Sequence, residues 1–404
     1  MNIAITGCQW GDEGKGKIVD LLAKKADYVV RYNGGGNAGH TLVVNGKTTI
    51  LHYVPSGVLR DKICVIGNGT VISLEKLKEE IDKLKADNIN PKIFISELAN
   101  IILPEDMESS KTEKAESTGR GIRPTYIRKA AREGIRMIDI LNVDFLHEDI
   151  SRDKVKENID YLKEQGWAKP LITNVSKLLN DAIKDNKNIL FEGAQGTWLD
   201  VDFGSHPYTT SSNAVVSGAP TGSGIGPHLI NKCLGVVKAY ITRVDRTGIS
   251  PLPTQDDGEG GNILREKGGE FGATTGRPRR CGWQDIPVLR HSILVNGFNS
   301  LILTKLDVLD HLEELKICTK YEINGKEYDI APADGLMLRK AKPIYETLPG
   351  WKGQTTAGIK NYDDLPENAK KYIKRIEELT DAKFSIICTG AERNDIIVLE
   401  DPWS

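Results

Sequence analysis

Residues 1–25 of the chain read MNIAITGCQWGDEGKGKIVDLLAKK, and this stretch decides the fold. Its first part, Asn2–Thr6, is short and apolar, which predicts a buried strand. A glycine-rich segment follows, and the amphipathic run Lys17–Lys25 predicts a helix. A strand that turns through glycines into a helix begins a parallel α/β unit, and its helix N-terminus offers backbone N–H groups to an anion.

The rest of the chain continues this alternation of strands and helices. Further strands are expected at Tyr28–Tyr32, Asn188–Phe191, Leu234–Val244, Ser300–Thr304, Phe384–Cys388 and Ile396–Leu399, and further helices at Leu74–Leu84, Gln284–Val295 and Asn368–Leu379. This pattern predicts an α/β fold with a large, mostly parallel central sheet covered by helices, and ligands at the carboxyl ends of its strands. Because no linker or repeat divides the sequence, we expect one domain over residues 1–404, with a charged helical scaffold around 144–185.

The composition excludes several classes of partner. Of the 404 residues, 39% are hydrophobic and 27% are charged, and the formal net charge is −2. Such a balance gives no field that would attract nucleic acid or an anionic membrane, so neither is expected as a partner. Six cysteines without a CxxC pair, and an N-terminus without an apolar leader, are typical of a cytoplasmic protein with reduced thiols.

The glycine-rich segment has the spacing of a phosphate-binding loop, G-x-x-x-x-G-K, with one departure. Ile18 stands where such loops carry the Ser or Thr that holds Mg²⁺. The metal therefore needs another oxygen ligand, and the nearby carboxylate of Asp12 is the candidate. The candidate nucleotide contacts in the loop are Gly11, Glu13, Gly14, Lys15, Gly16 and Lys17. A glycine-rich turn that only caps a helix is the alternative.

A second nucleotide signal follows a predicted strand. Thr304-Lys305-Leu306-Asp307 resembles the N-K-x-D guanine signature of GTPases, with Thr in the first place. One carboxylate can accept from guanine N1–H and the 2-amino group together, and adenine lacks that pair of donors. The stem of Lys305 can cover the base. An Asp that merely caps the end of a strand is the alternative.

A third candidate site is the loop at residues 272–280, which reads GATTGRPRR. Arg presents a planar fork of donors that matches a carboxylate, and Lys cannot copy this geometry. Together with two small hydroxyl side chains, these arginines suit a dicarboxylate. A basic surface loop is the alternative.

Several blocks together carry a family resemblance. QWGDEGKGK at residues 9–17 and RYNGGGNAGHT at residues 31–41 resemble the opening motifs of the adenylosuccinate synthetase family, and TKLDVLD at 304–310 is similar to its GTP motif. The resemblance extends from Met1 to about Trp403. It implies the fold of that family, with a phosphate-loop-like GTP site, and a ligase that uses GTP and Mg²⁺ to join L-aspartate to IMP. Adenylosuccinate, GDP and phosphate would form through 6-phosphoryl-IMP.

The resemblance implies catalytic roles for residues of the first two blocks. Asp12 would remove the proton from purine N1 and bind Mg²⁺ together with the carbonyl of Gly39. His40 would stabilise the charge that develops during phosphoryl transfer, and Lys15 would brace the phosphates. The chemistry is consistent with these roles, because the C6 oxygen of a 6-oxopurine is a poor nucleophile until N1 loses its proton. General-base help of this kind is worth ~10²–10⁴ in rate.

The remaining contacts are likewise implied by the resemblance. GTP would contact Thr41, Arg279, Lys305, Asp307, Cys388 and Gly390, with Cys388 at a position where the family has Ser. IMP would contact Asn37, Ala38, Thr118, Gln195, Thr210 and Arg277, and Gln195 is also a catalytic candidate. L-Aspartate would contact Thr274, Thr275, Arg277 and Arg279. Arg132 would reach the IMP phosphate of a partner subunit, so a homodimer with shared sites is expected.

Three departures from the family pattern leave alternatives open. Arg123 stands where the family usually has Gly, residues 244–255 differ from the usual V-G-x-G-P-F-P-T-E, and the region 144–185 is short. The first two lie near the expected purine pocket, so the same chemistry on GMP or dGMP is one alternative, although the retained Asp12 favours IMP. A GTP-binding switch without ligase activity is another, and it leaves the arginine loop without a role.

Overall fold

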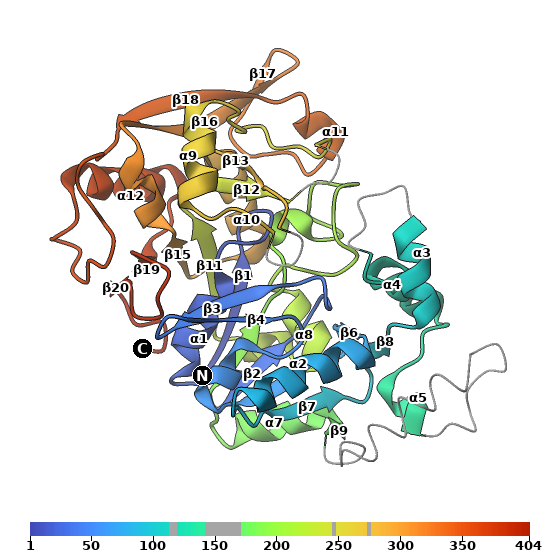
Figure 1. The fold of residues 1–404 in the computed structure, drawn as a ribbon. Coiled ribbons are helices and arrows are strands. Elements are labelled where there is room, and N and C mark those ends of the chain that lie inside the picture. Colours follow the sequence, from blue (N-terminus) through green and yellow to red (C-terminus); the bar gives the residue numbers. More distant parts are fainter. Residues whose placement is uncertain (113–118, 142–170, 245–247, 273–275) are drawn as a thin grey trace.

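A ten-stranded sheet runs through the centre of the molecule (Figure 1). The computed structural model describes residues 1–112, 119–141, 171–244, 248–272 and 276–404. The strands lie in the order β20 (Ile396–Val398), β19 (Phe384–Cys388), β15 (Ser300–Thr304), β11 (Lys232–Lys238), β1 (Asn2–Gly7), β10 (Ile189–Glu192), β2 (Tyr28–Arg31), β5 (Ile63–Ile66), β7 (Lys92–Ser96) and β9 (Ile172–Thr173). All neighbouring pairs are parallel except β19 with β20. The prediction of a large, mostly parallel central sheet is confirmed.

Helices cover both faces of this sheet. On one face, α1 (Lys15–Ala23) packs against Ile3 and Ile5 of β1. On the other face, α7 (Val175–Lys184) packs in a core cluster that contains Ala4. Successive side chains of a strand point to opposite faces, so a strand that is buried on both sides must be apolar throughout. This is why β1 reads as an unbroken apolar run.

The described part of the chain contains further helices. The other α-helices are α2 (Leu74–Ala86), α3 (Pro104–Thr112), α4 (Ile122–Ala131), α5 (Met137–Leu141), α8 (Gly218–Ser223), α9 (Glu259–Lys267), α10 (Ile286–Asn296), α11 (Gly335–Leu338) and α12 (Glu367–Thr380). Short 3₁₀ turns are η1 (Ser56–Arg60), η3 (Thr197–Leu199), η4 (Pro227–Leu229) and η5 (Leu306–His311). No helix in the described part of the chain is both long and apolar enough to cross a membrane.

A smaller mixed sheet and three strand pairs lie outside the central sheet. The small sheet contains β14 (Gln284–Asp285), β16 (Glu314–Ile323), β17 (Lys326–Tyr328) and β18 (Lys342–Pro349). The pairs are β3 (His40–Val44) with β4 (Lys47–Leu51), β6 (Val71–Ile72) with β8 (Asn100–Ile101), and β12 (Ile241–Arg243) with β13 (Arg280–Gly282). One apolar cluster joins α10, α12, β15 and β16, so the small sheet shares a core with the large one.

Most predicted elements end within two residues of the observed ones, but two differ in kind over part of their length. The single strand predicted over Leu234–Val244 is wrong, because the chain forms β11, bends at residues 239–240, and continues as β12 in another sheet. The helix predicted over Gln284–Val295 begins at Ile286, after the two-residue strand β14. Within the predicted helical scaffold at 144–185, the structure describes β9 and α7, and residues 142–170 lie outside the described part.

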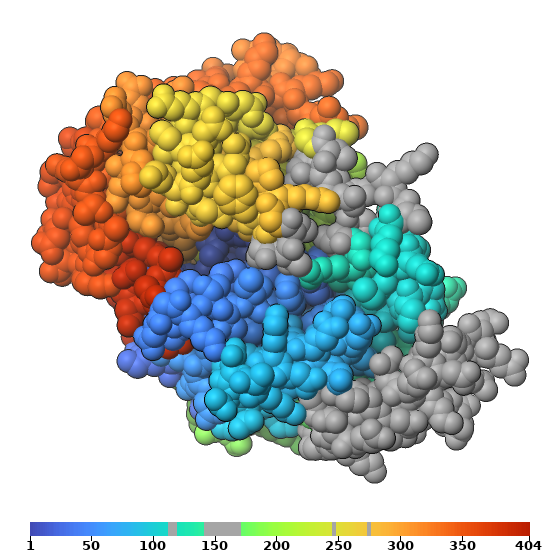
Figure 2. Space-filling view, viewed as in Figure 1, coloured from blue at the N-terminus to red at the C-terminus, as the bar shows by residue number. Residues whose placement is uncertain are grey.

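The carboxyl ends of the central strands meet along one edge of the sheet. β1, β10, β15 and β19 are parallel, so the loops that follow them lie at the same edge. In the space-filling view (Figure 2), dark blue atoms, which belong to the first part of the sequence, lie in a hollow. The hollow is between the yellow segment with α9 and the blue segment with β3 and β4. The predicted motifs therefore converge at the place where a parallel sheet binds its ligands.

Candidate active site

The loop between β1 and α1 has the backbone of an anion-binding turn. Gly11, Asp12 and Gly14 all have positive φ values, of 83°, 59° and 85°. Helix α1 begins directly after Gly14, so its first N–H groups face the loop. Ile18, the residue in the place of the usual hydroxyl, is fully buried in the core under the sheet. Its side chain therefore cannot be a metal ligand, which agrees with the interpretation of the sequence.

The Glu13 side chain holds the backbone of this loop through hydrogen bonds. Its fully buried carboxylate accepts hydrogen bonds from the backbone N–H of Gln9 at 3.0 Å and of Gly11 at 2.9 Å. The ammonium of Lys15 lies 2.5 Å from the same carboxylate. A Cβ on Gly7 would lie only 2.3 Å from Glu13 Oε2, so glycine is required where the carboxylate passes the strand. Glu13 thus contacts its own loop, and only its backbone remains for a phosphate.

Asp12 reaches the other side of the loop. Its carboxylate is 33% exposed, and it forms an ion pair with Arg279, whose Nε lies 2.9 Å from a carboxylate oxygen. Arg279 follows the loop at residues 272–278, so the predicted aspartate loop and the phosphate loop are in direct contact. The predicted base and metal ligand is thus open to solvent, with one arginine as its partner.

His40 forms a buried pair with Glu192. His40 Nδ1 is hydrogen-bonded to a Glu192 oxygen, and Glu192 also accepts from the Ser56 N–H at 2.8 Å and the Ser56 hydroxyl at 2.7 Å. Burial lowers the pKa of His40. Glu192 is also buried, which would raise the pKa of its carboxyl. The His40 and Arg31 side chains nevertheless hold this pKa below its usual value. Nδ1 of His40 is thus held by the carboxylate of Glu192, which leaves Nε2 for a substrate.

The second glycine-rich segment and the loop after β10 supply polar groups that have no partner. Both amide atoms of Gln195 and the Oδ1 of Asn37 are buried without a hydrogen bond. Gln195 has a positive φ of 62°, and its Oε1 would lie 3.0 Å from a Cβ built on Gly34. Buried polar atoms without partners are costly, so they mark a place where a ligand completes the hydrogen bonding. Ala38 is buried beside them, and its carbonyl accepts from His52 at 2.5 Å.

The predicted guanine segment lies against the phosphate loop. The Thr304 hydroxyl donates to the carbonyl of Glu13 at 2.6 Å, which ties the end of β15 to the loop. Lys305 has a positive φ of 57°, and Asp307 follows in η5. Burial raises the pKa of Asp307. Among the described residues no cation forms an ion pair with Asp307, which leaves its carboxylate available for the donor edge of a base.

The C-terminal part of the predicted GTP site is joined to α1. Lys17 Nζ donates to the carbonyls of Gly390 at 2.7 Å and Asp395 at 2.9 Å. Cys388, at the end of β19, is buried, and burial raises the pKa of its thiol to about 11. The neutral thiol keeps the segment apolar at this point. The first and last predicted GTP motifs thus lie together.

Glu270 is a central residue that the sequence did not reveal. Its fully buried carboxylate accepts four hydrogen bonds. The donors are Lys238 Nζ at 2.9 Å, Tyr240 OH at 2.5 Å, Lys305 Nζ at 3.1 Å and Arg279 Nη1 at 2.6 Å. A lone Glu after two glycines belongs to no motif, so only its spatial neighbours identify it. Glu192 was missed as well, although it lies within the segment FEGAQGT that contains Gln195.

The other predicted contacts are less closely gathered. Thr41 is exposed on β3, Thr210 is partly exposed, and Arg277 is exposed in the loop before β13. Arg132 ends α4 with a positive φ of 68° and is exposed. Thr118, Thr274 and Thr275 lie outside the described residues.

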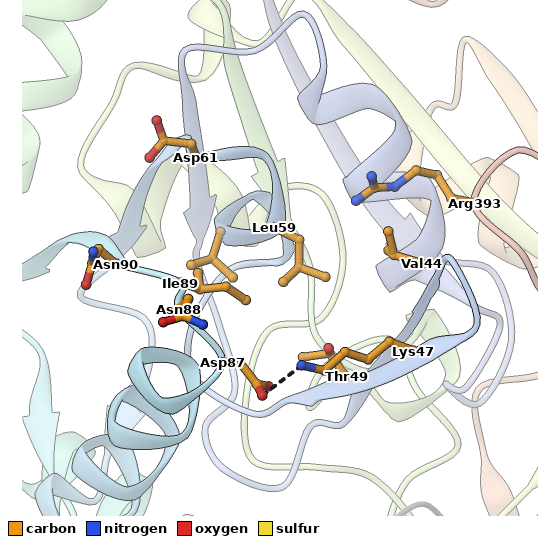
Figure 3. A pocket seen from close by; sticks show the side chains of 11 residues that line it. Val44, Lys47, Thr49, Leu59, Asp61, Asp87, Asn88, Ile89, Asn90 and Arg393 are labelled. Atoms are coloured by element: carbon orange, nitrogen blue, oxygen red, sulfur yellow. Dashed lines mark ion pairs between the residues drawn. The ribbon is translucent and has the colours of Figure 1, made fainter.

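A separate pocket of about 520 Å³ lies beside the β3–β4 hairpin (Figure 3). It is lined by residues of the hairpin, of η1 and of the loop after α2, and by Arg393. Two of the lining residues, Lys47 and Asp87, form an ion pair at 2.7 Å. None of the predicted site residues lines it. The pocket is therefore distinct from the cluster at the sheet edge, where the chemistry-bearing groups are.

Comparison with known proteins agrees with the geometry over the full chain. The sequence profile of the family "Adenylosuccinate synthetase" matches residues 4–397. The adenylosuccinate synthetase of Desulfatibacillum aliphaticivorans is 46% identical over 435 residues, which cover 100% of this chain and 99% of the relative. That of Halothermothrix orenii is 46% identical and covers 98% of each chain.

Solved structures agree at the level of the fold. The fully ligated adenylosuccinate synthetase from Plasmodium falciparum superposes with a TM-score of 0.90, at 37% identity over 98% of this chain and 99% of that chain. The succinoaminodeoxyadenylate synthetase of cyanophage S-2L, bound to dGMP and dATP, has a TM-score of 0.67 at 18% identity over 98% of this chain and 95% of its own, and thus shares the fold. On this extent of similarity, the chain belongs to the adenylosuccinate synthetase family.

Proposed function

We propose that this ligase joins L-aspartate to C6 of IMP and converts GTP to GDP and phosphate, with adenylosuccinate as the product. Family membership over the whole chain supports this reaction. The observation that carries the proposal at the level of the site is the convergence at one sheet edge. Asp12, the His40–Glu192 pair, the unpartnered Gln195 amide and the guanine segment all lie there.

In the first step, Asp12 removes the proton from N1 of IMP, and the C6 oxygen becomes anionic enough to attack the γ-phosphorus of GTP. The new P–O bond forms as the bond to the β-phosphate oxygen breaks, which releases GDP. Asp12 is exposed enough to reach a substrate, but it must first leave Arg279. His40, held by Glu192, faces the transferred group through Nε2, and the charge of that group would stabilise a proton there.

In the second step, the amine of L-aspartate attacks C6 and the phosphate leaves. Arg277, Arg279, Thr274 and Thr275 are the proposed contacts of its two carboxylates. When Arg279 turns from Asp12 to the substrate, the same movement would free the base for the first step. The loop therefore links the binding of L-aspartate to the release of Asp12.

The nucleotides occupy the two sides of the phosphate loop in this proposal. The guanine contacts Asp307 and Lys305, with the backbone at Cys388 and Gly390 beside it, and the phosphates contact the turn from Gly11 to Lys17. IMP lies on the other side, and its proposed contacts are Asn37, Ala38, Thr118, Gln195, Thr210 and Arg277. The unpartnered atoms of Gln195 and Asn37 support this assignment.

The residues present fit a magnesium ion. No group of three or more His, Cys, Asp or Glu side chains that could hold a metal occurs in the described residues. Mg²⁺ commonly takes one or two protein oxygens and fills the other positions with phosphate and water. Asp12 and the carbonyl of Gly39 are the proposed protein ligands. When bound, the ion would neutralise charge on the phosphates during transfer.

The partner subunit and the cellular location belong to the proposal too. An exposed Arg132 at the end of α4 can reach another subunit, which supports a homodimer that shares its IMP sites. A cytoplasmic location remains a prediction from the sequence.

A single assay tests the proposed function and its alternatives. Phosphate release and the change in purine absorbance are followed with GTP, Mg²⁺ and L-aspartate, and with IMP, GMP or dGMP in parallel reactions. We expect turnover that requires IMP and L-aspartate together. Turnover with only a guanylate would move the reaction to that substrate, and GTP hydrolysis independent of L-aspartate would contradict the ligase mechanism.

A further inference from the structure

We propose that Glu270 is a positioning residue that holds the guanine segment and the arginine loop on one buried carboxylate. GTP binding and L-aspartate binding then depend on the same anchor. This inference rests on the proposed function, because it uses the assigned roles of Lys305 and Arg279. Glu270 itself is fully buried, so it acts through the side chains that it holds.

The anchor begins in the backbone. The N–H of Arg279 donates to the carbonyl of Glu270 at 2.8 Å, and Phe271 forms a β-bridge with Pro278. These contacts close the base of the loop from 272 to 278. The loop therefore starts and ends at Glu270 and Arg279, so the position of the glutamate sets the position of both loop ends.

The side chain of Glu270 extends this anchor to the guanine segment. Lys305 Nζ donates to Glu270 Oε1 at 3.1 Å and to the carbonyl of Gly268 at 2.5 Å. On the other oxygen, Arg279 Nη1 donates at 2.6 Å while its Nε contacts Asp12. A continuous chain of contacts thus runs from the guanine segment through Glu270 and Arg279 to the phosphate loop.

The charges explain why a carboxylate is needed at this position. Three cationic side chains surround Glu270, and one of them, Lys238, is itself fully buried. Without the carboxylate, Lys238, Lys305 and Arg279 would repel one another at close range in a poorly solvated region. Glu270 allows the two substrate-binding cations to sit near each other, and it prevents Arg279 from pairing with Asp12 alone.

The decisive variant is Glu270→Gln, which keeps the shape and removes the charge. Oε1 receives three donors, so the amide oxygen would remain there and the NH₂ group would face Arg279 Nη1, donor against donor. We expect the KM for GTP and the KM for L-aspartate each to rise ~10-fold or more, because charged hydrogen bonds are lost. The KM for IMP should rise less than either of these, because Arg277 is the only one of its proposed contacts that lies in the loop anchored by Glu270.

Three matched variants separate this role from a general loss of folding. Tyr240→Phe removes one neutral donor and keeps the charge, so all three KM values should stay within about threefold. Glu346→Gln makes the same chemical change at the Glu346–Arg375 pair, which lies outside the site, and should leave the kinetics unchanged. Glu270→Asp restores the charge with a shorter reach and should recover part of the loss.

Each outcome decides the inference. Unchanged KM values in Glu270→Gln, or equal rises in all three, would overturn it, since a purely structural defect does not distinguish GTP and L-aspartate from IMP. If Glu270→Gln does not fold, the double variant Lys238→Met/Glu270→Met removes both buried charges and should give the same selective pattern. If the wild type does not ligate L-aspartate, the proposed function fails, and calorimetric binding of GTP still tests the anchor, with ~10-fold weaker binding expected in Glu270→Gln.

Discussion

At the scale of single residues, Asp12 combines exposure with a position inside the phosphate loop. We predict that Asp12→Asn lowers kcat by ~10²–10⁴, because an amide cannot accept the N1 proton. Folding should be unaffected, since the side chain is partly solvent-exposed and pairs with Arg279 at the protein surface rather than with a core residue. Urea unfolding and the ligation assay measure the two effects separately. A variant with near-normal turnover would remove Asp12 from the role of base.

Asp307 is predicted to select the base of the nucleotide. Asp307→Asn should raise the KM for GTP far more than that for IMP, because an amide presents a donor to the 2-amino group of guanine. Xanthosine triphosphate carries an oxygen at that position, so the variant should use it better than GTP while the wild type does the opposite. Comparison of kcat/KM for the two nucleotides in both proteins tests the assignment. An unchanged preference would place the base elsewhere.

The residues found from sequence and those missed differ in how they act. Asp12, His40 and Lys305 lie in glycine-rich or strand-end patterns whose local chemistry is visible in the sequence. Glu270 and Glu192 act through partners that are distant in sequence, Lys238 and His40 respectively. A buried carboxylate gains its function from the cations folded around it. No local pattern carries that information.

At the scale of elements, the break between β11 and β12 shows why a predicted strand failed. The apolar run from Leu234 onward favours one long strand. At the bend, however, some backbone groups are hydrogen-bonded to side chains. Gln9 bonds to the N–H and carbonyl of Lys238 and to the carbonyl of Tyr240, and Gln284 also donates to Lys238. The two amides satisfy the backbone there, so the chain can change sheets without loss of hydrogen bonds.

The start of α10 gives a prediction on pH and stability. Asp285 caps this helix at the Val288 N–H and accepts from the Tyr321 hydroxyl at 2.5 Å. Burial raises the pKa of Asp285 from its ordinary 3.8 to about 7. The folded protein keeps this proton up to about pH 7, whereas the unfolded chain loses it near pH 3.8. The contribution of Asp285 to stability is therefore present below 3.8 and is lost as the pH rises through 7.

The variant Asp285→Asn should remove this dependence. From pH 5 to pH 8 the wild type should lose roughly 2–3 kcal/mol of unfolding free energy at this site, and the variant should not. Urea denaturation at both pH values measures the difference. Asp364→Asn, at an exposed carboxylate, is the control and should behave as the wild type. Equal pH slopes in Asp285→Asn and the wild type would show that the carboxyl is ionised in the folded state.

At the scale of the whole molecule, the proposed shared sites can be tested by complementation. Arg132→Ala should lower activity and raise the KM for IMP, because the variant loses the positive charge that would contact the substrate phosphate. When it is mixed with inactive Asp12→Asn and the subunits exchange, half of the dimers are mixed and each has one intact site. Activity should then recover to about a quarter of the wild type. No recovery after proven exchange would mean that each subunit completes its own site.

The fold as a whole was largely predictable, for a physical reason. Strands buried on both faces need continuous apolar runs, and these alternate with amphipathic helices along the chain. The strand order was not predictable, since β11 follows β10 in sequence but lies on the other side of β1. The single-domain organisation over residues 1–404 stays a prediction.

The bond between Lys17 and the carbonyl of Gly390 joins residues 373 positions apart. During synthesis at about 5–20 residues per second, the phosphate loop therefore emerges roughly 20–75 seconds before the segment that completes its guanine side. Until then, a nascent chain has the phosphate loop and, once it is long enough, Asp307, but it lacks the backbone of Cys388 and Gly390 beside the base. The complete nucleotide site is thus among the last features that the protein acquires as it is made.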